Sequence, residues 1–317
     1  WLYSRATPDA TLGVCDGNMD SEGSPGTPIL PSYTSHNGYL MPRGFPVDGF
    51  VSGLKYEAKP NDLFVATYPK CGTTWMQHII WLILHDGEML RPHEKLTELF
   101  PHLEEVGADI VSSRPPASGG YRLIKTHLPY HMTPSHPRAK YVCVIRNPKD
   151  CVVSFYHHTA GFPKHYNFSN GSFDEYFRLF YEGQVDFGDY FSCVRSWLDR
   201  RNDPNILLLT YERLRSDTRA AVLEVATFLD PKLYPARLLE NDGEILKKIL
   251  LHSSIDSMKK DPLRWSSERK PEHTPFIRKG SLGQWDEQLR SEQAKLLDKR
   301  MRDVCSEEEL RFLGDQY

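Results

Sequence analysis

The chain has 317 residues, with 39 Lys and Arg against 42 Asp and Glu, so its formal net charge is −3. A charge this small gives no electrostatic indication of a nucleic-acid or membrane partner. The chain is 39% hydrophobic, 12% aromatic and 26% charged, which is the composition of a globular protein with a core and excludes disorder throughout.

The six cysteines are far apart and form neither a CxxC pair nor the dense framework of a small secreted domain. This usage favours a reducing compartment, and we expect a cytoplasmic protein. The most apolar stretch, residues 79–84, is far shorter than the roughly 20 residues that a membrane-spanning helix needs.

The N-terminal segment is rich in chain-breaking residues, since residues 1–60 contain 15 Gly or Pro and show no sustained hydrophobic period. We therefore predict a flexible tail over residues 1–44 and one domain over residues 45–317. Met19 is expected to be the native start, so that residues 1–18 would come from untranslated or cloning sequence.

The chain then alternates between strand-like and helix-like segments. A strand over 63–67 runs through a Pro-Lys-Cys-Gly turn into a helix over about 74–85. Further strands are predicted at 121–125, 140–146 and 205–210, and a long helix at about 286–302. The pattern predicts an α/β domain with a central parallel sheet flanked by helices, whose ligands lie at the carboxyl ends of the strands.

The turn after the first strand has the features of an anion site. Free backbone N–H groups at a helix N-terminus attract an anion, and Gly72 lets the backbone approach it closely. Lys70, Thr73 and Thr74 add one cation and two hydroxyl groups. The alternative is an ordinary turn with a solvent-facing Lys, and the spacing is not that of a Walker loop.

A second basic position follows the strand over 140–146, which ends in Arg146 where a kinase of related fold would place a metal-binding Asp. A cation there attracts a second anion and repels a metal ion. Ser154 follows in the next helix, so that Arg146 and Ser154 can bind one phosphate together. Taken singly, both residues are more often structural.

Five segments then identify a resemblance: YPKCGTTW, LIKTHLP, VCVIRNPKDCVVSFYHH, LLLTYERL and FIRKGSLGQW. In order and spacing they resemble the cytosolic sulfotransferases over about residues 45–315. The resemblance implies a single P-loop-like α/β domain. It also implies transfer of a sulfuryl group from 3′-phosphoadenosine 5′-phosphosulfate (PAPS) to a hydroxyl or amine of a small molecule such as a phenol, catecholamine or steroid, with no metal.

The resemblance assigns a donor site. Residues 70–75 would surround the 5′-phosphosulfate, with Trp75 stacked on adenine and Tyr211 near the purine. Arg146, Ser154, Arg278, Lys279 and Gly280 would hold the 3′-phosphate. The implied donor-binding residues are Lys70, Cys71, Gly72, Thr73, Thr74, Trp75, Arg146, Ser154, Tyr211, Ser253, Ile255, Met258, Arg278, Lys279 and Gly280.

The resemblance also assigns the catalytic residues His127, Lys70 and Lys125. An imidazole near pKa 6.5 accepts a proton at neutral pH, which suits His127 as the general base. Lys70 would stabilise the leaving oxygen and Lys125 the sulfuryl oxygens in transit. A lone His at a strand end is otherwise usually structural. A metal site with His131 is disfavoured because Pro129 interrupts any helix between the two histidines.

The sequence departs from the family at several positions. Cys71 replaces a usual Ser and is either an oxidation-prone thiol at a helix N-terminus or an inert small side chain. Ile255 replaces a Phe that often covers adenine. His102 and His158 replace Phe in phenol-sulfating members, and they either bind a polar acceptor or face solvent.

The homodimer motif of many members is also altered. It appears here as Asp286, Arg290-Ser291 and Lys295, with both end charges reversed. We therefore do not transfer the family dimer. Two rival functions remain. The first is a kinase of related fold, which needs ATP and magnesium. The second is a nucleotide-binding protein that has lost catalysis, but the three intact catalytic residues count against it.

Overall fold

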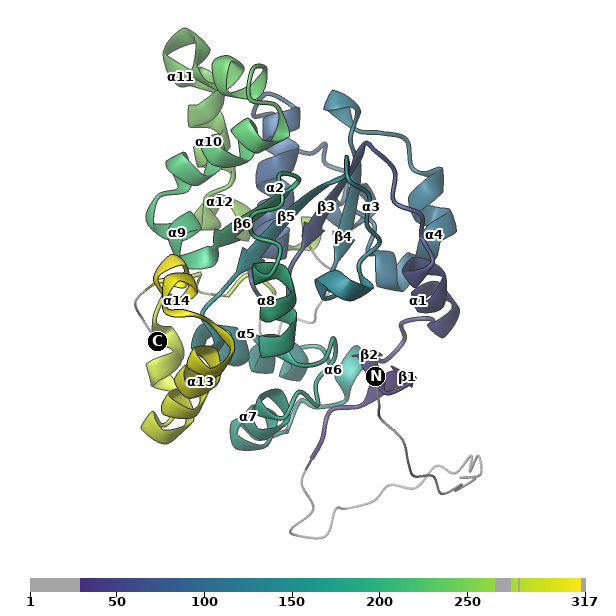
Figure 1. The fold of residues 1–317 in the computed structure, drawn as a ribbon, viewed down its shortest axis with the longest axis vertical. Helices are drawn as coiled ribbons and strands as arrows, with labels where there is room; N and C mark the ends of the chain where they lie inside the picture. Colours follow the sequence, from purple (N-terminus) through teal and green to yellow (C-terminus); the bar gives the residue numbers. More distant parts are fainter. Residues whose placement is uncertain (1–28, 266–274, 279, 315–317) are drawn as a thin grey trace.

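The computed structural model describes residues 29–265, 275–278 and 280–314, which form one α/β unit around a four-stranded sheet (Figure 1). The strands are β3 (Asp62–Ala66), β4 (Arg122–Thr126), β5 (Lys140–Ile145) and β6 (Ile206–Thr210). All three pairings are parallel, in the order β4-β3-β5-β6. The predicted parallel sheet and its four strand positions are confirmed to within one residue at each end.

The sheet is covered on both faces because alternate residues of its strands point to opposite sides. In β5, Tyr141, Cys143 and Ile145 join one apolar cluster, whereas Val142 and Val144 join the other.

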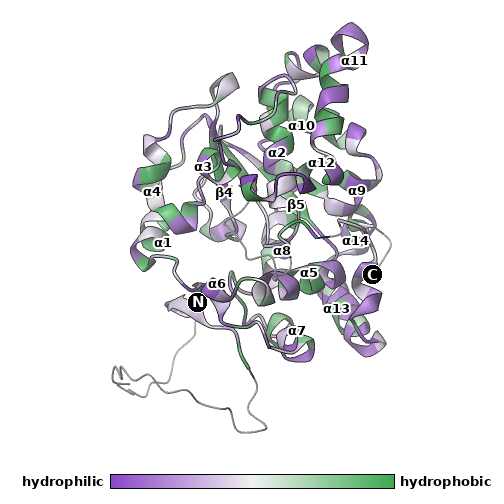
Figure 2. Ribbon diagram, turned by 180° about the vertical axis from the view of Figure 1, so that it is seen from behind, coloured by the Kyte–Doolittle hydropathy of each residue, from purple (hydrophilic) through white to green (hydrophobic). Residues whose placement is uncertain are grey.

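The first cluster is completed by residues from α4 (Leu103–Ser113), α5 (Pro148–Ala160), α7 (Phe173–Tyr181), α8 (Tyr190–Leu198), α13 (Ser291–Val304) and α14 (Glu307–Leu313). The second is completed from α2 (Thr73–Leu84), α3 (Leu96–Leu99), α9 (Tyr211–Ser216), α10 (Thr218–Leu229), α11 (Tyr234–His252) and α12 (Ile255–Lys259). Figure 2 shows the difference in hydropathy between α2, which is mostly green, and α13, which carries much purple.

The remaining elements are short. They are α1 (Val47–Leu54), which packs on α4, α6 (Pro163–Tyr166), and the 3-10 turns η1 (Ser118–Gly120), η2 (Tyr130–Met132), η3 (Pro262–Arg264) and η4 (Gln284–Glu287). No helix within the described residues is long and apolar enough to cross a bilayer.

The expected tail over residues 1–44 is wrong for its last part. Residues 33–42 form a hairpin of β1 (Tyr33–His36) and β2 (Tyr39–Pro42), paired antiparallel. Its turn is Asn37-Gly38, and both residues have positive φ, 50° and 81°, as a two-residue hairpin turn requires. The tail was predicted from the number of Gly and Pro residues, and the Asn-Gly turn signal within residues 33–42 was not considered.

The predicted helix over 286–302 is wrong at its start. η4 ends at Glu287, and α13 begins only at Ser291, because Arg290 has an extended backbone and acts as the N-cap residue. The side chain of Gln293 reaches back to the Arg290 backbone N–H at 3.0 Å, which fixes the helix start at this point.

Candidate active site

One cavity lies at the carboxyl edge of the sheet, where the residues that follow all four strands meet. Its lining extends from a region with two arginines to a region with three histidines. We call the first the arginine end, with Trp75, Arg146, Tyr211, Met258, Arg278 and Gly280. We call the second the histidine end, with Phe45, His102, His127, His158, Asp186 and Phe187. Lys70 and Lys125 line the same cavity.

The loop between β3 and α2 provides one wall. Lys70 and Gly72 both have positive φ, 67° and 101°, and Gly72 is the N-cap residue of α2. A Cβ on Gly72 would lie 2.8 Å from Cδ2 of Tyr211, so only glycine allows the loop to approach this ring. The N–H groups of the first turn of α2 have no partner inside the helix and are available to an anion.

The arginine end holds two cations close together. Arg146 follows β5 and donates to the Lys70 carbonyl oxygen at 3.1 Å, while its guanidinium lies 4.3 Å from the Tyr211 ring centroid. Its buried Nε has no hydrogen-bond partner among the described residues. Burial and the positive charge of Arg146 lower the pKa of Arg278. Two facing cations with a spare donor fit an anionic group between them.

Four further predicted residues complete this end. The indole of Trp75 donates from Nε1 to the Ser253 carbonyl oxygen at 2.8 Å, and its ring lies 5.6 Å from that of Tyr211. Ile255 and Met258 line the cavity from α12, and Gly280 packs on Ile255, because a Cβ there would lie 1.9 Å from Cδ1 of Ile255.

His127 dominates the histidine end, directly after β4. Its Nδ1 lies 2.7 Å from the carbonyl oxygen of Thr67, an acceptor only, so Nδ1 carries the hydrogen and Nε2 keeps a free lone pair. Its backbone N–H donates to Oε1 of Glu104 at 2.5 Å. Burial, Lys125 and His102 hold the pKa of His127 well below its ordinary value, against the opposing charge of Glu104.

Lys70 lies between the two ends of the cavity, whereas Lys125 lies near the histidines. Nζ of Lys70 lies 3.4 Å from Nδ1 of His158 and 4.4 Å from the Phe276 ring centroid. Burial lowers the pKa of Lys125, opposed by the charges of Glu105 and Glu104. A general base and two cations therefore share one cavity.

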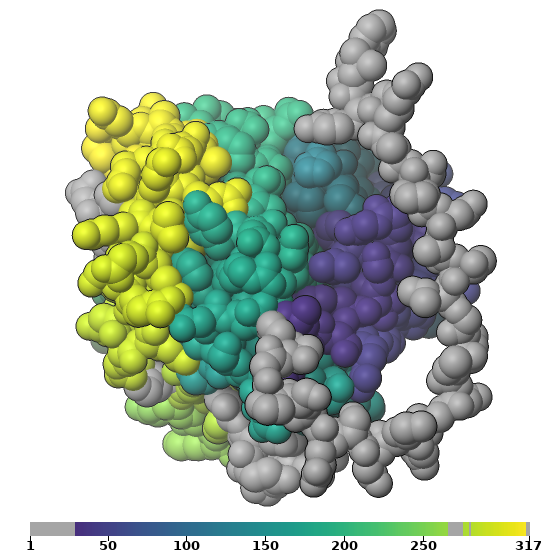
Figure 3. Space-filling model, turned by 90° about the horizontal axis from the view of Figure 1, so that it is seen from below, coloured from purple at the N-terminus to yellow at the C-terminus, as the bar shows by residue number. Residues whose placement is uncertain are grey.

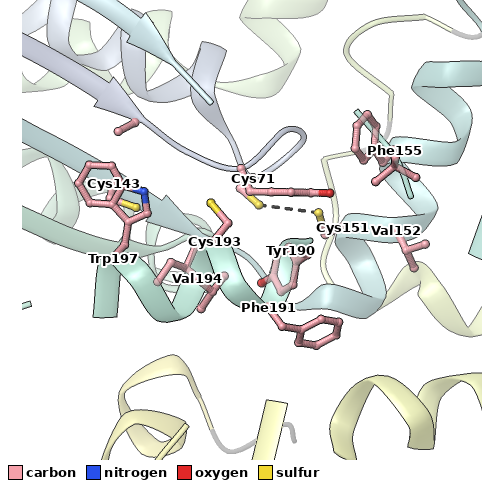
Figure 4. Close-up of a cluster of buried hydrophobic side chains, with 14 of the residues drawn as sticks. Cys71, Cys143, Cys151, Val152, Phe155, Tyr190, Phe191, Cys193, Val194 and Trp197 are labelled. Atoms are coloured by element: carbon pink, nitrogen blue, oxygen red, sulfur yellow. Dashed lines mark hydrogen bonds between the residues drawn. The ribbon is translucent and has the colours of Figure 1, made fainter. Parts of the chain in front are cut away.

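The structure brings together most of the predicted residues: Lys70, Gly72, Thr73, Thr74, Trp75, Lys125, His127, Arg146, Ser154, Tyr211, Ile255, Met258, Arg278 and Gly280, with His102 and His158. Two predicted residues do not line the cavity. Ser253 is buried behind Trp75, and Cys71 is buried below the loop, with its Sγ 3.8 Å from that of Cys151 (Figure 4). Lys279 lies outside the described residues.

The side chains that the sequence analysis missed are mainly in the histidine end. Asp186 and Phe187 lie in the turn between α7 and α8, and Phe187 contacts His127 with ring centroids 4.9 Å apart. The charge-bearing Glu104 and Glu105 follow His102 in α4. Only Phe276, two residues before Arg278 in a matched segment, could have been found from the motif.

Comparisons with known proteins agree on one family. A family profile described as "Sulfotransferase domain" matches residues 60–310. Sulfotransferase 1E1 of Cavia porcellus is 33% identical over 242 residues, covering 73% of this chain and 78% of that protein. Sulfotransferase 1B1 of Mus musculus is 30% identical over 277 residues, covering 82% and 88%.

Solved structures show the same fold. Mouse sulfotransferase SULT7A1 complexed with PAP has a TM-score of 0.70 and 24% identity, covering 89% of this chain and 98% of that chain. Retinol dehydratase in complex with androsterone and inactive cofactor PAP has a TM-score of 0.72 and 22% identity, covering 87% and 90%.

Proposed function

The chain belongs to the sulfotransferase family, and we propose that the cavity at the carboxyl edge of the sheet is where a sulfuryl group passes from PAPS to an acceptor hydroxyl or amine. As a PAPS-dependent sulfotransferase, the protein acts on small molecules. The co-substrate supplies the activated sulfuryl group and leaves as adenosine 3′,5′-bisphosphate (PAP). The observation that carries the proposal is that a neutral imidazole and two facing arginines line one cavity.

We propose that the arginine end binds the donor nucleotide. Arg146 and Arg278 supply charge for the 3′-phosphate, with Ser154 beside them on α5 and Lys279 following in sequence. Several charge-assisted hydrogen bonds, each contributing roughly 1.5–3 kcal/mol, would select a nucleotide with that phosphate. Trp75 and Tyr211 provide aromatic surface for the adenine, and Gly72 lets the α2 N-terminus reach the 5′ end.

The acceptor is activated in the histidine end. Nε2 of His127 takes the proton of the acceptor hydroxyl as the new S–O bond forms and the bond to the nucleotide breaks. The hydrogen bond from Nδ1 to Thr67 fixes the ring and its tautomer. Lys70, between the two ends, stabilises the charge that develops on the leaving oxygen, and Lys125 stabilises the sulfuryl oxygens.

The acceptor itself is proposed to be a phenol, catecholamine or steroid. Phe45, Phe155, Phe162 and Phe187 line the cavity and suit a flat ring, while His102 is buried against His127 with ring centroids 4.9 Å apart. His102 therefore belongs to the pocket rather than to the solvent-facing surface.

We further propose a cytoplasmic protein that does not form the dimer of its family. Arg290, which stands within the altered dimer motif, makes an ion pair with Asp174 of its own chain, with Nη2 and Oδ1 3.0 Å apart. That guanidinium is thus engaged internally. Sedimentation of the purified chain tests the proposal, and a stable dimer that R290A dissociates would contradict it.

The function is tested by transfer of labelled sulfate from PAPS to a panel of phenols, catecholamines, steroids and amines. We expect sulfated product from at least one hydroxyl class without added magnesium. A parallel reaction with ATP and magnesium tests the kinase alternative. Tight binding of PAP without any sulfated product would support the non-catalytic alternative.

A further inference from the structure

Asp186 is a buried acid in the histidine end that the reaction described above does not use, and burial raises the pKa of its carboxyl group to about 7. Its side chain is fully buried, and it lines the cavity from the turn between α7 and α8. Oδ2 accepts a hydrogen bond from the Tyr166 hydroxyl at 2.8 Å. Oδ1 is buried and has no hydrogen-bond partner among the described residues. Buried carboxylate oxygens are rarely left unpaired, because the lost hydration costs free energy.

The turn that carries Asp186 is held in place from several sides. Phe187 has φ of 64°, which a non-glycine residue adopts only where its surroundings enforce it. Its N–H donates to the Leu40 carbonyl oxygen in β2 at 2.9 Å, and the Tyr68 hydroxyl donates to the Gly188 carbonyl oxygen at 2.9 Å. The carboxylate therefore has a fixed position relative to His127.

The surroundings of Asp186 are polar but carry no cation. The groups that face it are hydroxyls from β1, β2, the loop after β3, and helices α6 and α7, and within the described chain it has no ion pair. They belong to Tyr33, Tyr39, Tyr68, Tyr166 and Tyr176. The Tyr33 hydroxyl is itself buried and unpaired, so a hydrogen bond between Tyr33 and Asp186 is the competing explanation.

The acid and the base line the same cavity. Phe187, the neighbour of Asp186, has its ring centroid 4.9 Å from that of His127. The aromatic side chains of this end, which include Phe45 and Phe187, offer ring faces that attract cations as well as flat rings. An acceptor whose hydroxyl is at His127 can therefore extend a charged group to Asp186.

We infer that Asp186 binds a protonated amine of the acceptor, so that the enzyme favours hydroxyl compounds carrying an ammonium group over neutral compounds of the same shape. This inference rests on the proposed function of the cavity. An ammonium group would donate to the unpaired Oδ1 and stabilise the ionised form of the carboxyl group, which a neutral acceptor cannot do.

The test compares tyramine with 4-propylphenol, in which a methyl group replaces the ammonium group. We expect wild-type kcat/KM to favour tyramine by at least about 10-fold, as one charge-assisted hydrogen bond implies. D186N should remove that preference by lowering kcat/KM for tyramine while leaving 4-propylphenol within about 2-fold. D189N is the matched control, since Asp189 caps α8 three residues later, and it should keep the preference.

Binding of both phenols to the complex with PAP, measured by calorimetry, gives the same comparison without turnover. Equal losses for both acceptors in D186N would show a structural role and overturn the inference. An unchanged preference for tyramine would also overturn the inference and would favour the hydrogen bond with Tyr33 as the role of Asp186. Absence of sulfate transfer to any acceptor would instead contradict the proposed function, and calorimetry would still decide the role of Asp186.

Discussion

Nδ1 of His127 lies 2.7 Å from the backbone carbonyl oxygen of Thr67, which joins the residues after two neighbouring strands, β4 and β3. This contact leaves Nε2 as the proton acceptor. We therefore expect H127A to lower turnover by at least about 100-fold, the usual contribution of a general base. The affinity for PAP, measured by calorimetry, should stay nearly unchanged, because His127 lies outside the arginine end.

The pH dependence of the reaction follows from the same group. Because burial lowers the pKa of His127, the imidazole stays neutral below pH 6.5 and loses its basic form only at more acid pH. The acid limb of the kcat profile should therefore lie below pH 6.5. A limb at or above that value would contradict the assignment of the base, as would full activity of H127A.

Gly72 and Tyr211 provide a test of the loop geometry. G72A places a methyl group 2.8 Å from the Tyr211 ring and adds the strain of positive φ, so we expect at least about a 10-fold loss in PAP affinity. G120A is the control: Gly120 has φ of 79° but no heavy atom within 4 Å of its Cβ position. The G120A variant should lose roughly 1–2 kcal/mol in the free energy of unfolding through backbone strain, and its affinity for PAP should stay unchanged.

Arg278 is expected to recognise the 3′-phosphate. R278A should weaken binding of PAP by about 10- to 100-fold, the range expected for one charge-assisted contact. Binding of adenosine 5′-monophosphate, which lacks that phosphate, should change far less. Equal losses for the two nucleotides in calorimetry would count against the arginine end as the 3′-phosphate site.

His78 makes the fold sensitive to acid independently of the cavity. Burial lowers its pKa to about 4, with Nε2 3.3 Å from the His252 carbonyl oxygen. The unfolded chain takes up this proton near pH 6.5, so stability is lost as the pH falls from about 6.5 toward 4. This group accounts for about 3 kcal/mol of that loss.

The measurement is urea unfolding of wild type and H78F at several pH values. H78F should lose this part of the pH dependence, whereas H93F, at an exposed histidine, should keep it. Identical pH slopes in wild type and H78F would contradict the assignment.

Local sequence signals explain most of the sheet and of the arginine end. The four strands are short and rich in apolar residues, and the motif residues follow them directly. Parallel pairing therefore brings the motif residues to one edge of the sheet. The start of α13 was missed because it depends on the Gln293 side chain accepting a hydrogen bond from the Arg290 backbone N–H rather than on hydropathy.

The histidine end is less predictable from sequence. Phe187 meets His127, and Asp186 meets Tyr166, only through tertiary contacts that involve α6, the turn before α8 and the hairpin. No spacing rule links an acid in one loop to a base 59 positions earlier in another. Cys71 shows the converse case: the motif placed it at the ligand, but its side chain turns toward Cys151 in the core.

The purple N-terminal part of the described chain, to which the hairpin of β1 and β2 belongs, packs beside the teal middle of the chain in Figure 3, and the Leu40 carbonyl oxygen accepts the hydrogen bond that fixes Phe187. A segment that precedes β3, the first strand of the central sheet in the sequence, thus helps to shape the histidine end of the cavity. Homologues that diverge only in these early residues should consequently differ in which molecules they sulfate, and swapping residues 33–42 between them offers a route to altered selectivity without touching a catalytic group.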